Sequence, residues 1–266
     1  MSDIRIGGST RLYGIVGDPI AQVKSPALYG ELFAAARMDA VMLPLHILPD
    51  RFDAAMPALM GIENLDGLLV TVPYKARAVR FAHRLGPVAS RIGAVNALRR
   101  EEDGTWTGDM FDGAGFVRAA ASKGNVLQGR RVALFGAGGA GSAIACELAA
   151  AGVESLSIID LQRERAQALA DTLSREFPDC RCVAVEAVPP ATNMIVNAST
   201  VGMHASDGLP GPLGPLNAGT LVGDVSTSEN ATPLIQQAIE HGCEYVNGRD
   251  MLRGQSDALM AFFRRD

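Results

Sequence analysis

The sequence has few of the residues that usually hold metal ions or build disulfide frameworks. Its 266 residues include only four cysteines and four histidines. No two cysteines form a CxxC pair, and no histidine stands at zinc-finger spacing from them. Cys180 and Cys182 resemble half of a metal site, but alternate positions on one short strand explain them more simply. We therefore expect reduced thiols, a cytoplasmic location and no metal.

The sequence also lacks a strong charge of one sign and a long hydrophobic run. The formal net charge is -5, so no basic footprint for nucleic acid and no polybasic membrane patch is expected. The most apolar helical stretch, residues 143–153, contains Glu147 and is too short to span a bilayer. The first twelve residues lack the apolar core of a signal peptide. Neither nucleic acid nor a membrane is an expected partner.

Short β-branched runs alternate with longer Ala- and Leu-rich runs in the first half of the chain. We expect strands over residues 12–17, 41–47, 67–72 and 94–99, and helices over residues 26–37, 51–60 and 75–85. Ser25 is a good N-cap for the first helix, with Pro26 at its first position. A pair of short strands follows, turning at residues 102–104, and another helix begins near Asp112. The alternation predicts βαβ units and a parallel-rich sheet.

A second series of strands and helices begins near Arg130. Its expected strands cover residues 131–135, 156–159, 182–185, 194–197 and 221–225. The last expected helix, over residues 250–263, has no strand after it. The fold class is therefore α/β, with a second αβ series following the first.

A glycine-rich motif opens the second series. It reads Gly136-Ala137-Gly138-Gly139-Ala140-Gly141 and stands between an expected strand and an expected helix. In this context, the first glycine permits a tight turn and Gly138 lets the backbone approach a pyrophosphate. Gly141 lets the helix pack closely on the strand. The N–H groups and the positive dipole end of that helix would face the phosphates.

An acidic residue stands where a dinucleotide site needs one. Asp160 ends the next expected strand, 24 residues after Gly136, as expected for a carboxylate that binds the ribose hydroxyls. A carboxylate repels a 2′-phosphate, so NAD is favoured over NADP, although Arg163 and Arg165 lie nearby and suit phosphate. The alternative interpretation is a tight turn followed by a solvent-exposed strand end.

Hydride transfer to a carbonyl requires a proton donor at the oxygen, and two residues are candidates. Lys75 follows Val70-Thr71-Val72-Pro73-Tyr74 at the end of a strand, and Asp112 begins a helix. Ligands of α/β proteins bind at such element ends. Taken alone, a helix-start lysine is usually solvated and a helix-start aspartate is usually an N-cap, so spacing alone does not select them.

Several short motifs in sequence order resemble the shikimate dehydrogenases, including the quinate/shikimate dehydrogenases, over nearly the whole chain. They lie at residues 14–20, 24–26, 70–75, 93–96, 112–116, 136–141, 197–203 and 247–252, with Gln255. The resemblance implies an N-terminal substrate domain at residues 1–111 and 247–266, to which the last helix returns, and a Rossmann-type dinucleotide-binding domain at residues 112–246. It implies a catalytic Lys75–Asp112 dyad in a cleft between the domains. It also implies substrate contacts from Ser25, Thr71, Asn96 and Gln255, and cofactor contacts from the glycine loop, Asp160, Ser199, Gly248 and Met251.

Four departures from the family pattern bear on the substrate. Val23 replaces a usual serine, Leu69 a usual asparagine, and Thr227 a usual aromatic residue, while Met110-Phe111 replaces Asn-Thr. Losing a hydrogen bond to a charged group costs about 1–3 kcal/mol. The resemblance implies a small shikimate- or quinate-like ring carboxylate as the substrate. Because of the departures, we expect shikimate itself to be a weak substrate or not the physiological one.

Each assignment has an alternative. Ser25 can simply cap its helix, Thr71 and Asn96 can satisfy backbone groups at strand ends, and Gln255 can lie on a solvated helix face. The same fold can act on an aminoshikimate-like acid, or serve as a non-catalytic dinucleotide-binding regulator. Retention of both Lys75 and Asp112 argues against the regulator. Homodimer formation and the direction of flux are left open.

Overall fold

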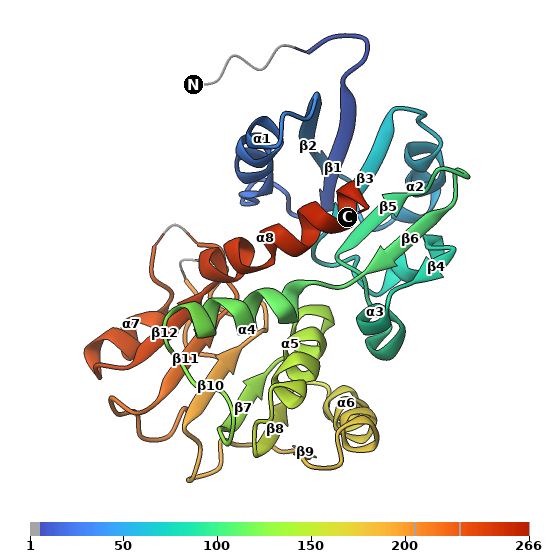
Figure 1. The fold of residues 1–266 in the computed structure, drawn as a ribbon. Coiled ribbons are helices and arrows are strands. Elements are labelled where there is room, and N and C mark those ends of the chain that lie inside the picture. The colour runs from blue at the N-terminus through green and yellow to red at the C-terminus, as the bar shows by residue number, and fades with distance from the viewer. Residues whose placement is uncertain (1–5, 205, 229, 266) are drawn as a thin grey trace. The chain divides into compact units, whose positions relative to one another are not determined.

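The computed structural model describes residues 6–204, 206–228 and 230–265. The chain divides into two compact units (Figure 1): the first comprises Met1–Met110 and Ala258–Asp266, and the second comprises Phe111–Asp257. Each unit contains its own six-stranded sheet, so the predicted α/β class is confirmed. The predicted domain boundaries after residues 111 and 246, with the roles attached to them, stay a prediction.

The sheet of the first unit is mixed. Its strands run in the order β2-β1-β3-β5-β6-β4. They are β1 (Arg11–Gly17), β2 (Ala40–His46), β3 (Leu65–Val70), β4 (Arg84–Leu85), β5 (Ala97–Arg100) and β6 (Trp106–Asp109). Strand β1 pairs in parallel with both β2 and β3, whereas β5 pairs antiparallel with β3 and β6. The carboxyl ends of β1, β2 and β3 therefore meet at one edge.

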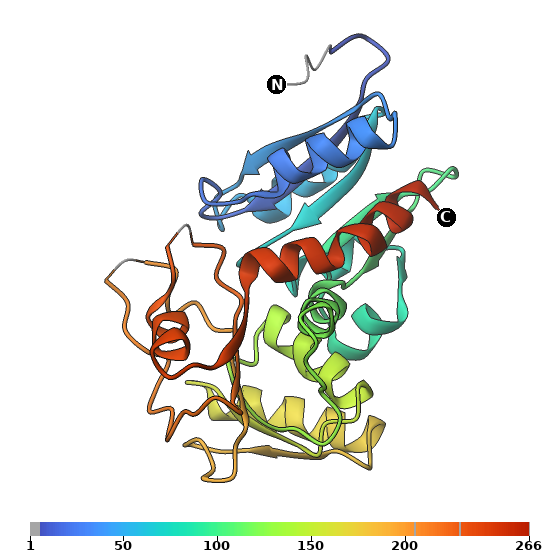
Figure 2. The ribbon, with the colours of Figure 1, turned by 60° about the vertical axis from the view of Figure 1, so that its left-hand side comes forward.

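Three short helices and one 3-10 helix accompany this sheet. They are α1 (Ser25–Ala35), α2 (Phe52–Met60), α3 (Pro87–Ile92) and η1 (Arg77–Phe81). Helix α1 packs along β2 (Figure 2). The predicted helix over residues 75–85 is wrong, because its second half joins the sheet. The N–H of His83 donates to the Trp106 carbonyl at 2.7 Å, and that of Gly86 to the Gly108 carbonyl at 2.8 Å.

The start of α1 also differs from the expectation. Lys24, not Ser25, occupies the N-cap position, and Ser25 is the first residue inside the helix. Its side chain is buried. The interpretation of Ser25 as a helix cap is therefore wrong.

The last helix, α8 (Gly248–Arg264), ends in the first unit, as predicted. The Phe263 ring of this helix packs edge-on against the Tyr13 ring, with the two centroids 5.0 Å apart. Its centroid lies 6.3 Å from that of the Tyr29 ring. A methyl group on Gly67 of β3 would lie 2.7 Å from Phe263. The glycine thus makes room for the aromatic ring over the sheet.

The second unit has a wholly parallel sheet in the order β12-β11-β10-β7-β8-β9. Its strands are β7 (Arg131–Phe135), β8 (Ser155–Ile159), β9 (Arg181–Ala184), β10 (Met194–Asn197), β11 (Leu221–Asp224) and β12 (Glu244–Asn247). This is the strand order of dinucleotide-binding folds. Successive strands are added on one side of β7 up to β9, and from β10 onward they are added on its other side, so the strand order reverses between β7 and β10. Ligands bind outside the carboxyl ends of the strands at that point.

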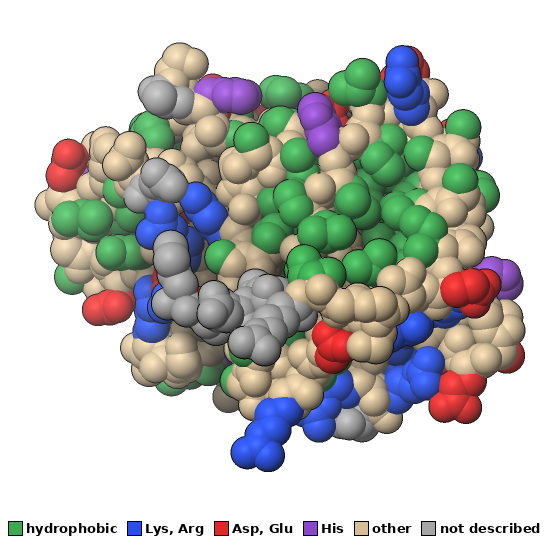
Figure 3. All heavy atoms as spheres, turned by 90° about the horizontal axis from the view of Figure 1, so that it is seen from above, with side chains coloured by type: hydrophobic (Ala, Val, Ile, Leu, Met, Phe, Trp, Pro, Cys, Tyr) green, Lys and Arg blue, Asp and Glu red, His purple; other side chains and the backbone are tan. Residues whose placement is uncertain are grey.

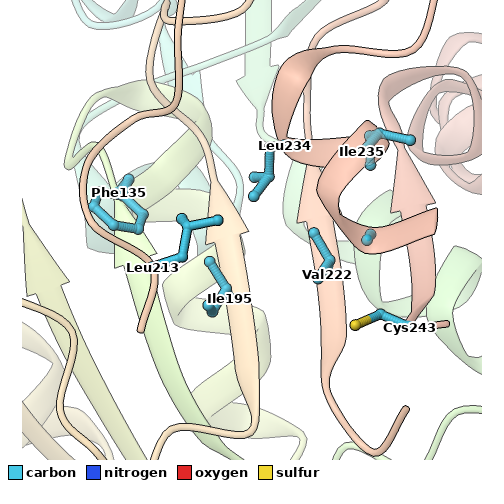
Figure 4. Packing of buried hydrophobic residues seen from close by; sticks show 8 residues of the cluster. Phe135, Ile195, Leu213, Val222, Leu234, Ile235 and Cys243 are labelled. Atoms are coloured by element: carbon cyan, nitrogen blue, oxygen red, sulfur yellow. The ribbon is translucent and has the colours of Figure 1, made fainter. Parts of the chain in front are cut away.

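The helices of the second unit are α4 (Asp112–Ser122), α5 (Gly139–Ala150), α6 (Arg163–Glu176) and α7 (Pro233–Glu240). Helix α4 packs on α5, and α7 packs on β11 and β12. Beneath α7, side chains from the strands, α7 and the 208–215 loop form a buried cluster (Figure 4). In the described part of the chain, no helix is long and apolar enough to cross a membrane.

Candidate functional site

In the first unit, Thr71, Lys75 and Asn96 lie together at the carboxyl end of β3. The turn that follows β3 carries Thr71 and Lys75, and the N–H of Tyr74 donates to the Thr71 carbonyl at 3.0 Å. The Lys75 carbonyl accepts from Val95 at 2.9 Å, and the Asn96 carbonyl accepts from Val70 at 2.8 Å. The backbone therefore fixes three of the predicted site residues at one sheet edge.

Gly17 brings the end of β1 close to the same residues. A methyl group on Gly17 would lie 2.4 Å from Cγ2 of Thr71, so glycine permits this close approach. The chain leaves β1 here and leads to Ser25 at the start of α1. The four substrate and proton-transfer residues predicted in this unit thus come from neighbouring elements.

Two residues that replace polar family positions have different environments. Leu69 is buried in β3, opposite Ala97 of β5 and Ile15 of β1. Val23 is half-buried in the segment before α1. Leu69 is therefore part of the hydrophobic core, whereas Val23 is partly accessible.

In the second unit, the glycine loop lies at the reversal point of the sheet. Gly136 follows β7 with φ +95°, and a methyl group there would lie 2.8 Å from the Ser199 nitrogen. A methyl group on Gly141 would lie 1.9 Å from the Gly136 carbonyl oxygen. Both glycines are thus required by the local geometry, as the motif predicted.

Gly138 has a different environment. A methyl group there would meet no atom within 4 Å, and the residue is half-exposed at the N-terminus of α5. Helix N-termini present N–H groups and the positive end of the helix dipole to anions. An open surface of this kind beside a helix N-terminus fits the pyrophosphate of a dinucleotide, which Gly138, Gly139 and Ala140 would hold.

Asp160 at the end of β8 is joined to this loop. Its Oδ2 accepts a hydrogen bond from the Ala137 N–H at 2.7 Å, and its Oδ1 accepts from the Gln162 N–H at 2.8 Å. An ionised carboxylate has about four acceptor positions, so capacity is left for a ribose diol. Asp160 is half-buried, and its bond to the loop argues against an isolated, solvent-exposed strand end.

The cation nearest to Asp160 in sequence is engaged elsewhere. Arg163 forms an ion pair with Glu186, which follows β9. The register pairs Ile158 of β8 with Ala184 of β9, so Glu186 follows the strand next to that of Asp160. Two carboxylates therefore lie at neighbouring strand ends on this side of the glycine loop.

Helices α4 and α8 make a close contact within the second unit. A methyl group on Gly115 would lie 2.6 Å from the Met251 carbonyl oxygen and 2.8 Å from Cβ of Gln255. Gln255 is buried, so the solvated-face interpretation is wrong. Asp112, one turn before Gly115, is also buried and is the first residue within α4 rather than its N-cap.

The loop after β10 and the start of α8 complete the predicted cofactor residues. Ser199 lies beside Gly136, and the N–H of Gly248 donates to the Ser226 carbonyl at 3.2 Å.

Asp224 at the end of β11 was not predicted to have a role, yet burial raises the pKa of its carboxyl group. The sequence feature that could have predicted Asp224 is an aspartate at the end of a hydrophobic strand.

No group of three or more His, Cys, Asp or Glu in residues 6–204, 206–228 and 230–265 is arranged to hold a metal ion.

Comparison with known proteins identifies similar sequences. Residues 15–98 match the family model described as the shikimate dehydrogenase substrate binding domain. A shikimate dehydrogenase (NADP(+)) of Anaeromyxobacter sp. (strain K) is 35% identical over 252 residues, which cover 93% of this chain and 88% of the relative.

Solved structures with the same fold extend the similarity. The shikimate 5-dehydrogenase from Listeria monocytogenes, in complex with shikimate and NAD, has a TM-score of 0.85 and 27% identity, with coverage of 98% of this chain and 94% of that chain. The quinate dehydrogenase from Corynebacterium glutamicum, in complex with NAD, has a TM-score of 0.83 and 29% identity, with coverage of 96% and 93%.

Proposed function

Because this chain belongs to the shikimate dehydrogenase family, we propose that it interconverts a ring hydroxyl and a ketone on a shikimate- or quinate-like carboxylate. It is an NAD(P)-dependent dehydrogenase. The observation that carries the proposal is the joining of the glycine loop to Asp160 at the reversal point of a parallel sheet.

NAD is the proposed cofactor. The Asp160 carboxylate can accept hydrogen bonds from a ribose diol but repels a 2′-phosphate. Glu186 adds a second negative charge at the next strand end and pairs with Arg163. Arginine is the side chain best suited to bind phosphate, so its pairing weakens the case for NADP.

Lys75 is the proposed proton carrier. A bound nicotinamide would supply the hydride acceptor for oxidation of the substrate and the hydride donor for its reduction. During oxidation, the substrate carbon loses its hydrogen with the bonding electron pair, and Lys75 takes the hydroxyl proton. During reduction, Lys75 returns that proton to the carbonyl oxygen. The Asp112 carboxylate accepts hydrogen bonds and so orients the lysine and the substrate hydroxyl.

Ser25, Thr71, Asn96 and Gln255 are the proposed substrate-binding residues. Ser25 and Gln255 are buried polar side chains, and helix capping and solvation do not explain them. The hydrophobic replacements Val23 and Leu69 favour a second candidate substrate class, namely an aminoshikimate-like or other ring acid with different polar groups.

The experiment that tests the proposal is a panel assay of the purified protein. Shikimate, quinate and amino analogues are each supplied with NAD and with NADP, and absorbance at the reduced nicotinamide band is followed. Turnover of at least one ring acid is expected. Absence of turnover with every pair would overturn the proposed reaction.

We also propose that the chain forms a homodimer. Exposed hydrophobic side chains are visible beside charged ones on the face drawn in Figure 3. In the first unit, the exposed large hydrophobic residues include Leu43 on the edge strand β2. Light scattering after size exclusion measures the mass, and a monomer at every concentration would contradict the dimer.

A further inference from the structure

Asn197 and Asp224 form a buried polar pair at the carboxyl edge of the second sheet. They end β10 and β11 and face each other in the strand register, and each is 1% exposed. The Asn197 amide donates to Val201 O at 2.8 Å and to Asp224 Oδ2 at 3.3 Å. Its Oδ1 accepts from the Ser199 nitrogen at 3.1 Å and from the Ser199 hydroxyl at 2.6 Å. One side chain thus sets the path of residues 197–201.

Asp224 extends this network to two further segments. Its Oδ1 accepts from the Ser226 N–H at 2.9 Å, and its Oδ2 accepts from the Thr232 hydroxyl at 2.8 Å. The Thr232 hydroxyl in turn accepts from the Ile235 N–H at 3.3 Å and so caps α7. These donors are all neutral groups, and burial raises the pKa of the carboxyl group.

Ser226 connects Asp224 to the loops around the proposed cofactor site. Its hydroxyl donates to the Gly202 carbonyl at 3.3 Å, and its carbonyl accepts from the Gly248 N–H at 3.2 Å. A methyl group on Gly248 would lie 2.4 Å from that carbonyl oxygen, and one on Gly136 would lie 2.8 Å from the Ser199 nitrogen. The network therefore reaches the 197–202 loop, the start of α8 and the back of the glycine turn.

We propose that Asp224 is a positioning residue for dinucleotide binding, acting through Asn197 and Ser226 on Ser199, Gly248 and the glycine turn. The proposal rests on the assignment of those residues to the cofactor. Both carboxylate oxygens receive donors, so an amide at this position would turn an NH₂ group toward one of them. The Ser226 N–H or the Asn197 and Thr232 donors would then lose their acceptor.

The test measures NADH binding by the fluorescence of the reduced nicotinamide, independently of turnover. Asp224→Asn is expected to raise the Kd for NADH about 10-fold, the effect of one lost buried hydrogen bond to a charged group. Thr232→Val should also raise the Kd for NADH. Thr232→Ser keeps the hydroxyl and should therefore keep the Kd of the unmodified chain. Thr220→Val is the matched control, because Thr220 is buried at the opposite end of β11.

The outcomes separate positioning from a general role in folding. A purely structural Asp224 would lower the folded fraction and the apparent kcat, while the folded protein kept the Kd of the unmodified chain, and this result overturns the proposal. If Asp224→Asn does not fold, Thr232→Val with an unchanged Kd has the same meaning. Unmodified protein that binds NADH but turns over no ring acid overturns the proposed reaction only. Failure to bind both NADH and NADPH overturns both.

Discussion

The carboxylate of Asp160 accepts a 2.7 Å hydrogen bond from the backbone N–H of Ala137, and so joins the end of β8 to the glycine loop. The same side chain is the one proposed to bind the adenosine ribose. Replacing it with alanine would therefore change both the charge at the ribose and the support of the loop. An asparagine removes the charge and keeps one acceptor oxygen for the Ala137 N–H, so it preserves more of the loop support than alanine does.

Cofactor preference is the first prediction. The unmodified enzyme should have a higher kcat/KM with NAD than with NADP. Asp160→Asn keeps an acceptor oxygen for the Ala137 N–H, loses the one for the Gln162 N–H and removes the repulsion of a 2′-phosphate, so the preference should fall about 10-fold. Glu186→Gln should shift it in the same direction by a smaller factor, because both members of its pair with Arg163 are exposed, at 81% and 70% of the side chain. A native preference for NADP would contradict the role given to Asp160.

The second prediction contrasts two glycines of one loop. Gly138→Val adds a side chain where no atom lies within 4 Å, at a backbone φ of -78° that valine adopts readily. The thermal midpoint should stay the same, while NADH affinity should fall more than 10-fold because the pyrophosphate approach is filled. Gly136→Ala, at φ +95° and against the Ser199 backbone, should lower the thermal midpoint as well. Calorimetry and fluorescence titration check both, and normal NADH affinity in Gly138→Val would contradict the pyrophosphate assignment.

The sequence was most informative where the structure depends on local backbone geometry. The turn at Gly136 and the close contact at Gly141 follow from residues adjacent in the chain, so the motif predicted them. The helix expected over residues 75–85 failed because the pairing partner of residues 84–85 lies in β6, about twenty residues away. Asp224 was missed for the same reason, since its partners Asn197, Ser226 and Thr232 meet only when β10, β11 and α7 pack together. The Ser25 cap failed by one residue, the usual precision of helix ends.

Docking of the last helix on the first unit gives a third prediction. Phe263 is buried against Tyr13 and above Gly67, so Phe263→Ala should lower the free energy of unfolding by about 3–5 kcal/mol. The neighbouring Phe262 is only half-buried and contacts the Arg99 guanidinium at 4.6 Å, so Phe262→Ala should cost less. Urea denaturation measures both, and equal losses would argue against a specific docking role for Phe263.

Substrate specificity gives a fourth prediction, which the structure divides into two parts. Val23→Ser restores a hydroxyl at a half-buried position. The KM for shikimate should therefore fall severalfold, by about 10-fold at most. The stability of the protein should change little. Leu69→Asn places an amide in the core beside Ala97 and Ile15, which costs about 1–3 kcal/mol unless the amide finds a partner. Kinetics with a parallel denaturation series distinguish the two effects. A rise in KM for Val23→Ser would mean that the pocket is organised around a different acid.

Proton transfer by Lys75 is the final prediction. The lysine is held at the end of β3 by the bond from Val95 N–H to its carbonyl, so removing its side chain leaves the backbone support in place. Lys75→Ala should lower kcat by about 10²–10⁴, the usual contribution of general acid–base catalysis. KM should change much less, because the interaction is strongest in the transition state. Asp112→Asn should also lower kcat, by a similar or smaller factor, since it removes the charge that orients the lysine but not the lysine itself.

The effects of replacing two residues that act as one unit are not additive in free energy, so the double variant should lose less than the product of the single losses. Steady-state kinetics on the best ring acid of the panel measure all three variants, with NADH affinity as the control for an intact second unit. A Lys75→Ala enzyme with near-normal kcat would remove Lys75 from the mechanism, and full multiplicativity in the double variant would separate Asp112 from it.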